Sequence, residues 1–495
     1  MTDIIIHKKD DVYVNIECEA SIAHDLSDYF TFKVPGYKFM PAYRSRAWDG
    51  KIRLFNAFGG ELYYGLVPYV VEFAERHELT IQTLPLERTT TVEETAEFFK
   101  KLNPQVGLSP IQPYDYQYEA LHHGLNQKRA LMLSPTSSGK SLMIYALVNW
   151  YMNTIEKKIL IIVPTTSLVE QLYKDFEDYS AGSGNADACR MFYNTHRIYA
   201  GKAKETEKKV VITTWQSIYK LKKDWFQKFG VVIGDEAHNF KAKSLTSILT
   251  KMTDCEYKFG FTGTLDGTQT HRLVLEGLFG AVHKVTTTKE LMDSETIAKL
   301  HIEAVTLGYT DVEKKAVKLM TYKEEIDFLI THKKRNDFIC NLALSRPKNT
   351  LILFQYVDKH GKKLYEYITK KDPERPVFFV SGEVKTEVRE EIRAITETST
   401  NAIIVASYGT FSTGINIRNL HSVIFGHPAK SRIRNLQSVG RVLRLDTGKT
   451  KATLFDISDD LSWKKHKNFS LKHFLERVKI YNTEKFDYKL RSIKL

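Results

Sequence analysis

The chain has 495 residues, of which 42% are hydrophobic and 26% are charged, values typical of a globular protein with roughly three domains. Its 72 Lys and Arg residues exceed its 59 Asp and Glu residues by 13. This excess favours a polyanionic partner, most simply nucleic acid, although a basic protein without such a partner is an open alternative.

The sequence argues against a membrane protein and against a protein with a metal cluster. No segment stays apolar for the ~18 residues that a membrane span needs, and the N-terminal apolar run is too short for a signal peptide. The four cysteines form no CxxC pair, so neither a zinc site nor an iron–sulfur cluster is expected. We therefore expect a soluble protein of the reducing cytoplasm.

The order of apolar runs predicts an α/β protein. Residues 1–85 alternate short β-like runs with turn signals, and a polar stretch over 86–104 suggests a linker with a short helix. Two series of apolar runs follow, separated by helical patterns, which predicts two parallel sheets with crossover helices. The first series is RALML, KILIIVP, KVVITT, FGVVIGDE and YKFGFTGT; the second is NTLILF, RPVFFVSG, NAIIVASY, HSVIFG and KATLFDI.

These patterns predict four parts of the chain. An N-terminal accessory domain with its linker covers 1–105, two tandem α/β domains cover 106–288 and 289–457, and a basic tail covers 458–495. Between 463 and 495 the tail has ten Lys or Arg residues against three acidic ones, and we expect it to be helical and exposed. Such a tail could follow DNA phosphates, or it could be a solvated helix.

A candidate phosphate-binding loop lies at 134–141, SPTSSGKS. It departs from the G-x-x-x-x-G-K-[ST] pattern because Ser134 replaces the first glycine. It lies between an apolar run and a predicted helix, where loop amides and a helix N-terminus can bind phosphate oxygens. Lys140 would then reach the β- and γ-phosphates, and the Ser141 hydroxyl would ligate Mg²⁺. A chance Gly-Lys-Ser turn is the alternative.

A second candidate is the acidic sequence DEAH that ends the run FGVVIGDEAHNF. Carboxylates at the carboxyl end of a buried strand lie where open α/β sheets bind ligands. Asp235 suits the Mg²⁺ shell, and Glu236 suits the orientation or deprotonation of an attacking water. Together with the loop at 134–141, this pair favours ATP hydrolysis over a solvated loop.

The third candidate is the sequence NLQSVGRVLRLD in the second α/β series. Gln437, Arg441 and Arg444 lie on one predicted helix, and the two arginines, three residues apart, share a face. Guanidinium groups aimed at a nucleotide on the other domain would stabilise charge on the transferring phosphoryl group. Taken alone, a solvated basic helix face explains them as well.

The order of these motifs resembles that of the superfamily 2 DExH-box helicases and translocases across about 110–457. SPTSSGKS is similar to motif I, DEAH to motif II, FTGTL to motif III and QSVGRVLR to motif VI. Motif I of this superfamily often lacks its leading glycine. Within the superfamily, the chain most resembles the UvsW-type helicases of bacteriophages, including at GYKFMPAYRSRAWDGKIRLFN and LFDISDD.

The resemblance implies two RecA-like P-loop domains that bind ATP and Mg²⁺. It implies a DNA helicase that remodels forks, Holliday junctions and R-loops in phage recombination, repair and replication, in the host cytoplasm. Protein partners stay unassigned. The residues that it implies are Gln117, Thr136, Ser137, Ser138, Gly139, Lys140, Ser141 and Gly414 for ATP, His238, Thr262 and Thr264 for coupling, and Thr166, Thr214, Ser381 and Ser407 for the DNA backbone.

An arginine-rich stretch in the N-terminal domain predicts a further DNA contact. YRSRAWDGKIRLF reads as a β-hairpin, because Asp49-Gly50 is a favoured type I′ turn dipeptide. That hairpin would pair Arg46 with Arg53, and a phosphate backbone would relieve the repulsion. A solvated hairpin is the alternative. The face that would contact DNA consists of Arg44, Arg46, Trp48, Lys51 and Arg53.

Two other functions fit the same motifs. An RNA helicase would share them, because the DEAH sequence does not separate DNA from RNA. A protein of another class, an ATP-switched clamp or annealing protein, would bind nucleic acid without unwinding it. The predicted nucleic-acid partner is therefore branched or duplex DNA, with RNA in RNA–DNA hybrids as a further candidate.

Overall fold

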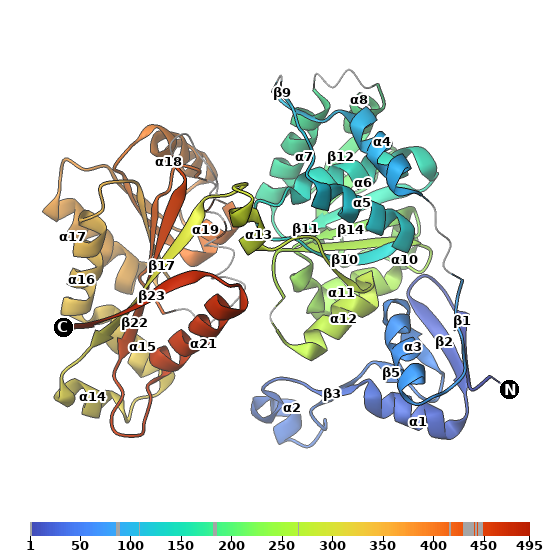
Figure 1. Cartoon of the computed structure of the whole chain (residues 1–495), viewed down its shortest axis with the longest axis horizontal. Coiled ribbons are helices and arrows are strands. Elements are labelled where there is room, and N and C mark those ends of the chain that lie inside the picture. Colours follow the sequence, from blue (N-terminus) through green and yellow to red (C-terminus); the bar gives the residue numbers. More distant parts are fainter. Residues whose placement is uncertain are drawn as a thin grey trace. The chain divides into compact units, whose positions relative to one another are not determined.

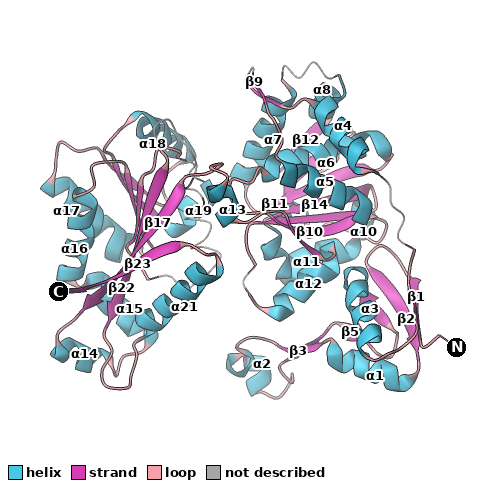
Figure 2. Cartoon of the chain, viewed as in Figure 1, coloured by secondary structure: helices cyan, strands magenta, loops and turns pink. Residues whose placement is uncertain are grey.

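The structure is a computed structural model of the chain and describes residues 2–85, 90–107, 109–181, 186–265, 267–414, 417–428, 440, 443 and 449–495. The chain divides into two compact units, Met1–Ser134 with Gly139–Val285, and Pro135–Ser138 with Thr286–Leu495. The first unit contains an N-terminal domain and an α/β domain, here lobe 1, and the second contains lobe 2 (Figures 1 and 2).

The N-terminal domain is built on a five-stranded sheet of order β5-β6-β2-β1-β7, in which only the β1–β7 pairing is parallel. A separate two-stranded ribbon joins β3 to β4. The strands are β1 (Ile4–Lys8), β2 (Tyr13–Cys18), β3 (Thr31–Lys33), β4 (Lys51–Arg53), β5 (Phe55–Asn56), β6 (Glu61–Tyr63) and β7 (Ile81–Gln82). The helices are α1 (Ala20–Tyr29), η1 (Tyr37–Phe39), α2 (Pro41–Arg44), η2 (Tyr64–Leu66) and α3 (Val67–Arg76).

The linker contains the short helix that its sequence predicts. Helix α4 (Val92–Leu102) begins with a capping box, in which Thr91 Oγ1 accepts a hydrogen bond from Glu94 N at 3.1 Å and Thr91 N donates to Glu94 Oε2 at 2.8 Å. This reciprocal pair satisfies amides that a helix N-terminus otherwise leaves unbonded. A short two-stranded sheet, β8 (Gln105–Val106) with β9 (Ser109–Pro110), follows it.

Lobe 1 is a seven-stranded parallel sheet of order β12-β13-β11-β14-β15-β10-β16. All five runs of the first apolar series form strands, as predicted. The strands are β10 (Arg129–Leu133), β11 (Lys158–Val163), β12 (Thr195–Ile198), β13 (Val210–Thr214), β14 (Phe229–Asp235), β15 (Tyr257–Thr262) and β16 (Val282–Lys284). The helices are α5 (Asp115–Gln127), α6 (Lys140–Thr154), α7 (Thr166–Ser180), α8 (Ala186–Tyr193), α9 (Trp215–Ile218), α10 (Lys223–Phe226), η3 (Ala237–Lys241), α11 (Lys243–Lys251) and α12 (Gln269–Phe279).

Both faces of the lobe 1 sheet are buried, which explains why its strands are apolar throughout. On β11, Ile159 and Ile161 pack with α5, α6 and α7, whereas Leu160 and Ile162 pack with α11 and α12 on the opposite face (Figure 1). The hydrophobic core on the α11–α12 face continues into the N-terminal domain.

The N-terminal domain therefore packs directly on lobe 1. Tyr69 Oη donates a hydrogen bond to Glu276 Oε2 at 2.6 Å. A Cβ atom on Gly65 would lie 2.0 Å from the carbonyl oxygen of Glu276, so only glycine permits this approach of η2 to α12. The buried Arg129 guanidinium lies 4.2 Å from the Tyr64 ring centroid and 3.5 Å from Asp11 Oδ1.

Lobe 2 is a second seven-stranded parallel sheet, of order β19-β20-β18-β21-β22-β17-β23. The second apolar series forms five of its strands, as predicted. The strands are β17 (Lys299–Gly308), β18 (Thr350–Phe354), β19 (Val377–Val380), β20 (Ile403–Ser407), β21 (Ser422–Phe425), β22 (Lys451–Asp460) and β23 (Asp487–Lys494). The helices are α13 (Thr288–Asp293), α14 (Asp311–Val317), α15 (Tyr322–Thr331), α16 (Lys333–Leu344), η4 (Val357–Gly361), α17 (Lys362–Lys371), α18 (Thr386–Thr398), α19 (Tyr408–Gly414) and α21 (Phe469–Thr483).

The basic tail is helical over α21, but it is also part of lobe 2. Its last residues form β23, which pairs in parallel with β17 at the edge of the sheet. The expectation of an exposed tail is wrong for Arg477, whose buried guanidinium donates to both carboxylate oxygens of Asp456 at 2.8–3.0 Å. The tail can pack at this point because the Arg477 cation lies on the buried Asp456 carboxylate.

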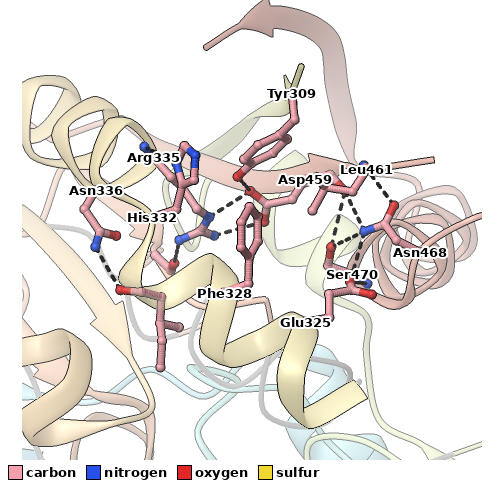
Figure 3. A network of polar contacts seen from close by, with 12 residues as sticks. Tyr309, Glu325, Phe328, His332, Arg335, Asn336, Asp459, Leu461, Asn468 and Ser470 are labelled. Atoms are coloured by element: carbon pink, nitrogen blue, oxygen red, sulfur yellow. Dashed lines mark hydrogen bonds and ion pairs between the residues drawn. The ribbon is translucent and has the colours of Figure 1, made fainter. Parts of the chain in front are cut away.

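A second polar network holds the start of α21 (Figure 3). Glu325 on α15 accepts hydrogen bonds from Asn468 Nδ2 at 3.0 Å, Phe469 N at 2.8 Å and Ser470 N at 2.7 Å. This carboxylate satisfies amide groups at the helix N-terminus and offsets its partial positive charge. Among the described residues, no helix has both the length and the apolarity to cross a membrane.

Candidate ATP site

The loop at 134–141 joins β10 to α6, the strand-to-helix position expected of a phosphate-binding loop. Ser137 has φ 70° and Gly139 has φ 82°, and α6 begins at Lys140. Ser134 N donates to Thr262 O at 2.8 Å, so the loop leaves the sheet beside β15. A left-handed turn followed by a helix N-terminus directs backbone amides toward one point, which suits an anion such as a phosphate.

Gln117 lies against this loop. Its buried side chain approaches Gly139 so closely that a Cβ atom at that position would lie 2.2 Å from Gln117 Nε2. Gln117 Oε1 also accepts a hydrogen bond from Tyr114 N at 3.0 Å, which caps α5. The structure thus brings Gln117 and the loop together, as the assignment of both to one nucleotide requires.

Asp235 and Glu236 lie at the carboxyl end of β14, beside the loop. Lys140 Nζ lies 3.5 Å from Glu236 Oε1, and Glu236 N donates to Asp235 Oδ1 at 2.9 Å. Glu236 has φ 51°, a left-handed conformation that is uncommon for this residue type. Backbone strain of this kind concentrates at functional sites, where the surrounding structure enforces it.

Burial raises the pKa of Asp235 to about 6, partly opposed by the nearby Lys140 ammonium and reinforced by Glu236. A charge buried in a protein is costly unless it is paired. A cation at Asp235 would relieve that cost. The carboxylate is therefore suited to a metal ion and would lose this capacity as it becomes protonated below about pH 6.

His238 connects the acidic pair to β15. Its Nδ1 lies 3.0 Å from Thr262 Oγ1 and 3.3 Å from Glu236 Oε2. Thr262 Oγ1 donates its single proton to Thr264 O at 3.0 Å, so His238 Nδ1 must carry the hydrogen of the other bond. The three residues predicted to couple the motifs therefore form one hydrogen-bonded chain.

The hydroxyl groups and the carboxylate of the site fit a nucleoside triphosphate with its metal ion. Ser137 Oγ and Thr264 Oγ1 are buried and have no hydrogen-bond partner among the described residues. A buried hydroxyl without a partner is uncommon and points to a ligand that supplies one. Ser141, in the first turn of α6, and Asp235, at the end of β14, would hold Mg²⁺.

The four residues assigned to the DNA backbone differ in exposure. Thr166 is exposed at the start of α7, and Ser407 is half-buried with its hydroxyl 2.8 Å from Thr410 Oγ1. Thr214 and Ser381 are 5% and 1% exposed, so their backbone atoms are better placed than their hydroxyls to reach a ligand. Thr214 Oγ1 already lies 2.9 Å from Ser217 Oγ.

The predicted hairpin around Asp49-Gly50 is wrong. Arg44 ends α2, Arg46 has φ 59°, and Trp48 Nε1 donates to Lys51 O at 2.8 Å, so residues 44–48 form no strand. Pro41 favours a helix start there, a local signal that the turn dipeptide obscured. Strand β4 pairs instead with β3, about twenty residues upstream.

The ribbon still concentrates positive charge. Its register places Lys33 opposite Lys51 and Thr31 opposite Arg53, while Phe32 and Ile52 face the core. Sequence reasoning missed Lys33, because its partner strand is distant in the chain. Arg53 is not free of partners, since its Nη2 donates to Asp49 Oδ2 at 2.6 Å.

The remaining candidates belong to lobe 2. Gln437, Arg441 and Arg444 lie outside the described residues, so their placement stays a prediction. Gly414 is the last residue of α19, which follows β20 directly.

Three family models match the chain. "DNA helicase UvsW, N-terminal" matches residues 3–83, "Type III restriction enzyme, res subunit" matches 110–267, and "Helicase conserved C-terminal domain" matches 333–446. These matches lie within the N-terminal domain, lobe 1 and lobe 2 respectively.

The chain is similar to known helicases over its whole length. It is 36% identical over 515 residues to the ATP-dependent DNA helicase uvsW of Enterobacteria phage T4, with 100% of both chains covered. The crystal structure of T4 UvsW also covers 100% of both chains, with 34% identity and a TM-score of 0.53. The DNA 3'-5' translocase XPB2 of Sulfurisphaera tokodaii is 26% identical over 41% of this chain and 42% of its own. The chain therefore belongs to the UvsW family of superfamily 2 ATP-dependent DNA helicases.

Proposed function

We propose that this protein uses ATP hydrolysis at lobe 1 to unwind and remodel branched DNA, namely forks, Holliday junctions and R-loops, in recombination, repair and replication. The observation that supports the chemistry most directly is the meeting of the loop at 134–141 with Asp235 and Glu236, where Lys140 Nζ lies 3.5 Å from Glu236 Oε1. The full-length likeness to a phage DNA helicase supports the substrate class.

The residues of the site have distinct proposed roles. Loop amides and Lys140 bind the phosphates, and Gln117 binds the adenine. Bound Mg²⁺, held by Ser141 and Asp235, would supply charge neutralisation at the phosphates. A phosphate would compete with Glu236 for the Lys140 ammonium, leaving the Glu236 carboxylate free to accept a proton from water.

We propose that the loss of the contact between Glu236 and Lys140 is transmitted to the end of β15. The residues that transmit it are His238, Thr262 and Thr264. Hydrogen bonds run without a break from His238 Nδ1 through Thr262 Oγ1 to Thr264 O, so a change in the contact between Glu236 and His238 would alter its neighbours. Thr166, Thr214, Ser381 and Ser407 are proposed to contact the sugar–phosphate backbone, as are the cations of the N-terminal ribbon. Phosphate contacts carry no base code, which suits a motor that moves along any sequence.

The test compares wild type with Lys140→Ala and with Lys228→Ala as a control. Lys228 lies at a distant, exposed site, where it pairs with Glu205. ATPase activity is measured with forked DNA, duplex DNA and RNA, and strand displacement is measured on the forked duplex. We expect stimulation by branched DNA and loss of both activities only in Lys140→Ala. Strand displacement by Lys140→Ala at the wild-type rate would contradict the ATP-motor role. Stronger stimulation of the wild-type ATPase by RNA than by DNA would indicate an RNA helicase. DNA binding by the wild type without strand displacement would indicate a clamp.

A further inference from the structure

A cavity of about 540 Å³ opens in the N-terminal domain beside the basic ribbon. Its volume lies in the ~300–1,000 Å³ range of small-molecule sites. Four of its lining residues are aromatic, and four others have polar side chains, Ser27 among them. Its lining includes Tyr13, Phe55, Phe58 and Tyr63, together with Arg53, Asn56 and Glu61.

Phe58 stands at the tip of the β5–β6 hairpin and is fully exposed. The turn that presents it is rigid. Asn56 Oδ1 accepts a hydrogen bond from Phe58 N at 3.2 Å, and Ile16 N donates to Gly60 O at 2.7 Å. Gly60 has φ 62°, and a Cβ atom there would lie 2.3 Å from Ile16 O, so glycine is required for this close contact with β2. An apolar ring is thus held in water by a well-anchored turn.

The inner wall of the cavity is also aromatic. The Tyr13 and Tyr63 rings are stacked, with centroids 5.1 Å apart and planes at 20°. Phe55 also lines the cavity, but its buried side chain lies opposite Leu62, on the core face of the sheet. Flat rings on a wall and at a rim suit a flat ligand that stacks, because aromatic rings attract one another in offset or edge arrangements.

The polar side chains of the lining indicate which part of a nucleic acid would enter the cavity. Asn56 offers its Nδ2 amino group, since its Oδ1 already accepts from Phe58 N, and Glu61 offers a carboxylate that is paired with Lys9. A carboxylate in the lining repels a phosphate but accepts hydrogen bonds from the exocyclic amine of a base. Arg53 at the mouth, with Lys51 and Lys33 on the adjoining ribbon, supplies charge for the phosphates on either side.

We propose that this cavity binds one unpaired base of a DNA strand, with Phe58 and the Tyr13–Tyr63 pair as stacking surfaces and Asn56 and Glu61 at its hydrogen-bonding edge. The proposal rests on the proposed function, since a DNA branch point provides such a base. The amine-accepting carboxylate favours adenine, cytosine and guanine, which carry an exocyclic amine, over thymine, which has none. Because the N-terminal domain packs on lobe 1 through Tyr69 and Glu276, the cavity would hold that base in a fixed position relative to lobe 1.

The test is a double-mutant cycle on the full-length protein, in which the Phe58 side chain and the unpaired DNA base are each removed in turn. Equilibrium binding is measured to a forked duplex with one unpaired adenine at the junction and to the same DNA with an abasic nucleotide at that position. We expect Phe58→Ala to weaken binding to the first DNA by about 5- to 150-fold, the effect of losing one base–aromatic stack. We expect little effect of Phe58→Ala on binding to the abasic DNA, where the stack is already missing.

Two further variants make the result specific. Phe58→Trp should restore binding, since it restores a stacking ring, and Glu61→Gln should reduce the preference for adenine over thymine, since it replaces the carboxylate that accepts from the base amine. Tyr193→Ala is the control, because Tyr193 is an exposed aromatic residue of lobe 1 that lies outside the cavity. Equal weakening of both DNAs by Phe58→Ala, or no weakening of either, would overturn the proposal. Failure of the proposed function would appear separately, as wild-type ATPase activity that no DNA stimulates.

Discussion

Arg335 and Asp459 form a bidentate ion pair in which both side chains are fully buried. Arg335 Nε and Nη2 donate to Asp459 Oδ1 and Oδ2 at 2.7 and 3.1 Å, and Arg335 Nη1 donates to Gly426 O at 2.8 Å. Tyr309 Oη adds a hydrogen bond to Asp459 Oδ1 at 2.7 Å, as Figure 3 shows. The pair joins α16 to β22 across 124 residues of the chain, and Arg335 Nη1 joins α16 to Gly426, directly after β21, across 91 residues.

Removal of one partner should therefore destabilise lobe 2 strongly. We expect Asp459→Ala to lower the free energy of unfolding by about 3–5 kcal/mol, because it leaves the Arg335 guanidinium buried without its counter-ion. Replacing both residues together, as Arg335→Met with Asp459→Leu, should cost less than Asp459→Ala alone. The measurement is hydrogen exchange of the β17 and β18 amides.

The control for this pair is Asp327→Ala, which breaks the exposed ion pair between Asp327 and Lys359. Exposed pairs contribute little, because water solvates and screens both charges. Equal destabilisation by Asp327→Ala and Asp459→Ala would show that burial of the Arg335–Asp459 pair has no energetic consequence.

Asp235→Asn should abolish ATPase activity and also stabilise lobe 1 at neutral pH. The folded-state pKa of Asp235, about 6, lies above its usual value of 3.8. A raised pKa means that the ionised form of Asp235 is penalised in the folded state. The group therefore favours folding below about pH 4, and this contribution to stability is lost as the pH rises through about 6. Asparagine cannot ionise, and we expect a gain of about 1–3 kcal/mol at pH 7.5.

The gain from Asp235→Asn should shrink as pH falls from 7.5 to 4. Thermal unfolding at both pH values measures it, with Asp224→Asn, on the short helix α10, as a control for the loss of a carboxylate. A stabilisation that is the same at both pH values would contradict the assignment of this pKa to Asp235.

Gly65→Ala should loosen the N-terminal domain from lobe 1. The added Cβ atom would lie 2.0 Å from Glu276 O, and that oxygen belongs to packed backbone that cannot move easily. We expect faster proteolysis of the segment before residue 85 in Gly65→Ala. Gly382→Ala is the matched control, because a Cβ atom on Gly382 has no heavy atom within 4 Å. Equal proteolysis rates in both variants would argue against a fixed interface.

Gln117→Glu should weaken the selection of ATP over GTP. A glutamate keeps the carboxyl oxygen that can accept from Tyr114 N and cap α5, but it lacks the amide donor that reads a base. We expect kcat/KM for ATP to fall by about tenfold, the effect of one lost hydrogen bond, with a smaller change for GTP. Thermal unfolding of Gln117→Glu checks that the cap remains, and an unchanged ATP/GTP ratio would remove Gln117 from the nucleotide site.

Much of the fold and of the ATP site could be predicted from the sequence, because the signals are local. Parallel strands buried on both faces are apolar throughout, so the runs that became β10, β11, β14, β18 and β20 are visible without partners. The loop at 134–141 and the DEAH sequence each follow such a run, and a parallel sheet brings its carboxyl ends to one edge. The contact between Lys140 and Glu236 follows from that geometry.

Only the tertiary structure decided features that depend on distant partners. The pairing of β4 with β3 overrode a favourable local turn dipeptide, because Phe32 and Ile52 gain burial in the core. Arg477 became buried because Asp456 lies opposite it, although the tail that contains it has ten Lys or Arg residues against three acidic ones. The aromatic cavity and the packing of Gly65 on α12 likewise join segments that no local pattern links. The free energy of such contacts comes from burial and pairing across the chain, and a linear pattern does not record which partners meet.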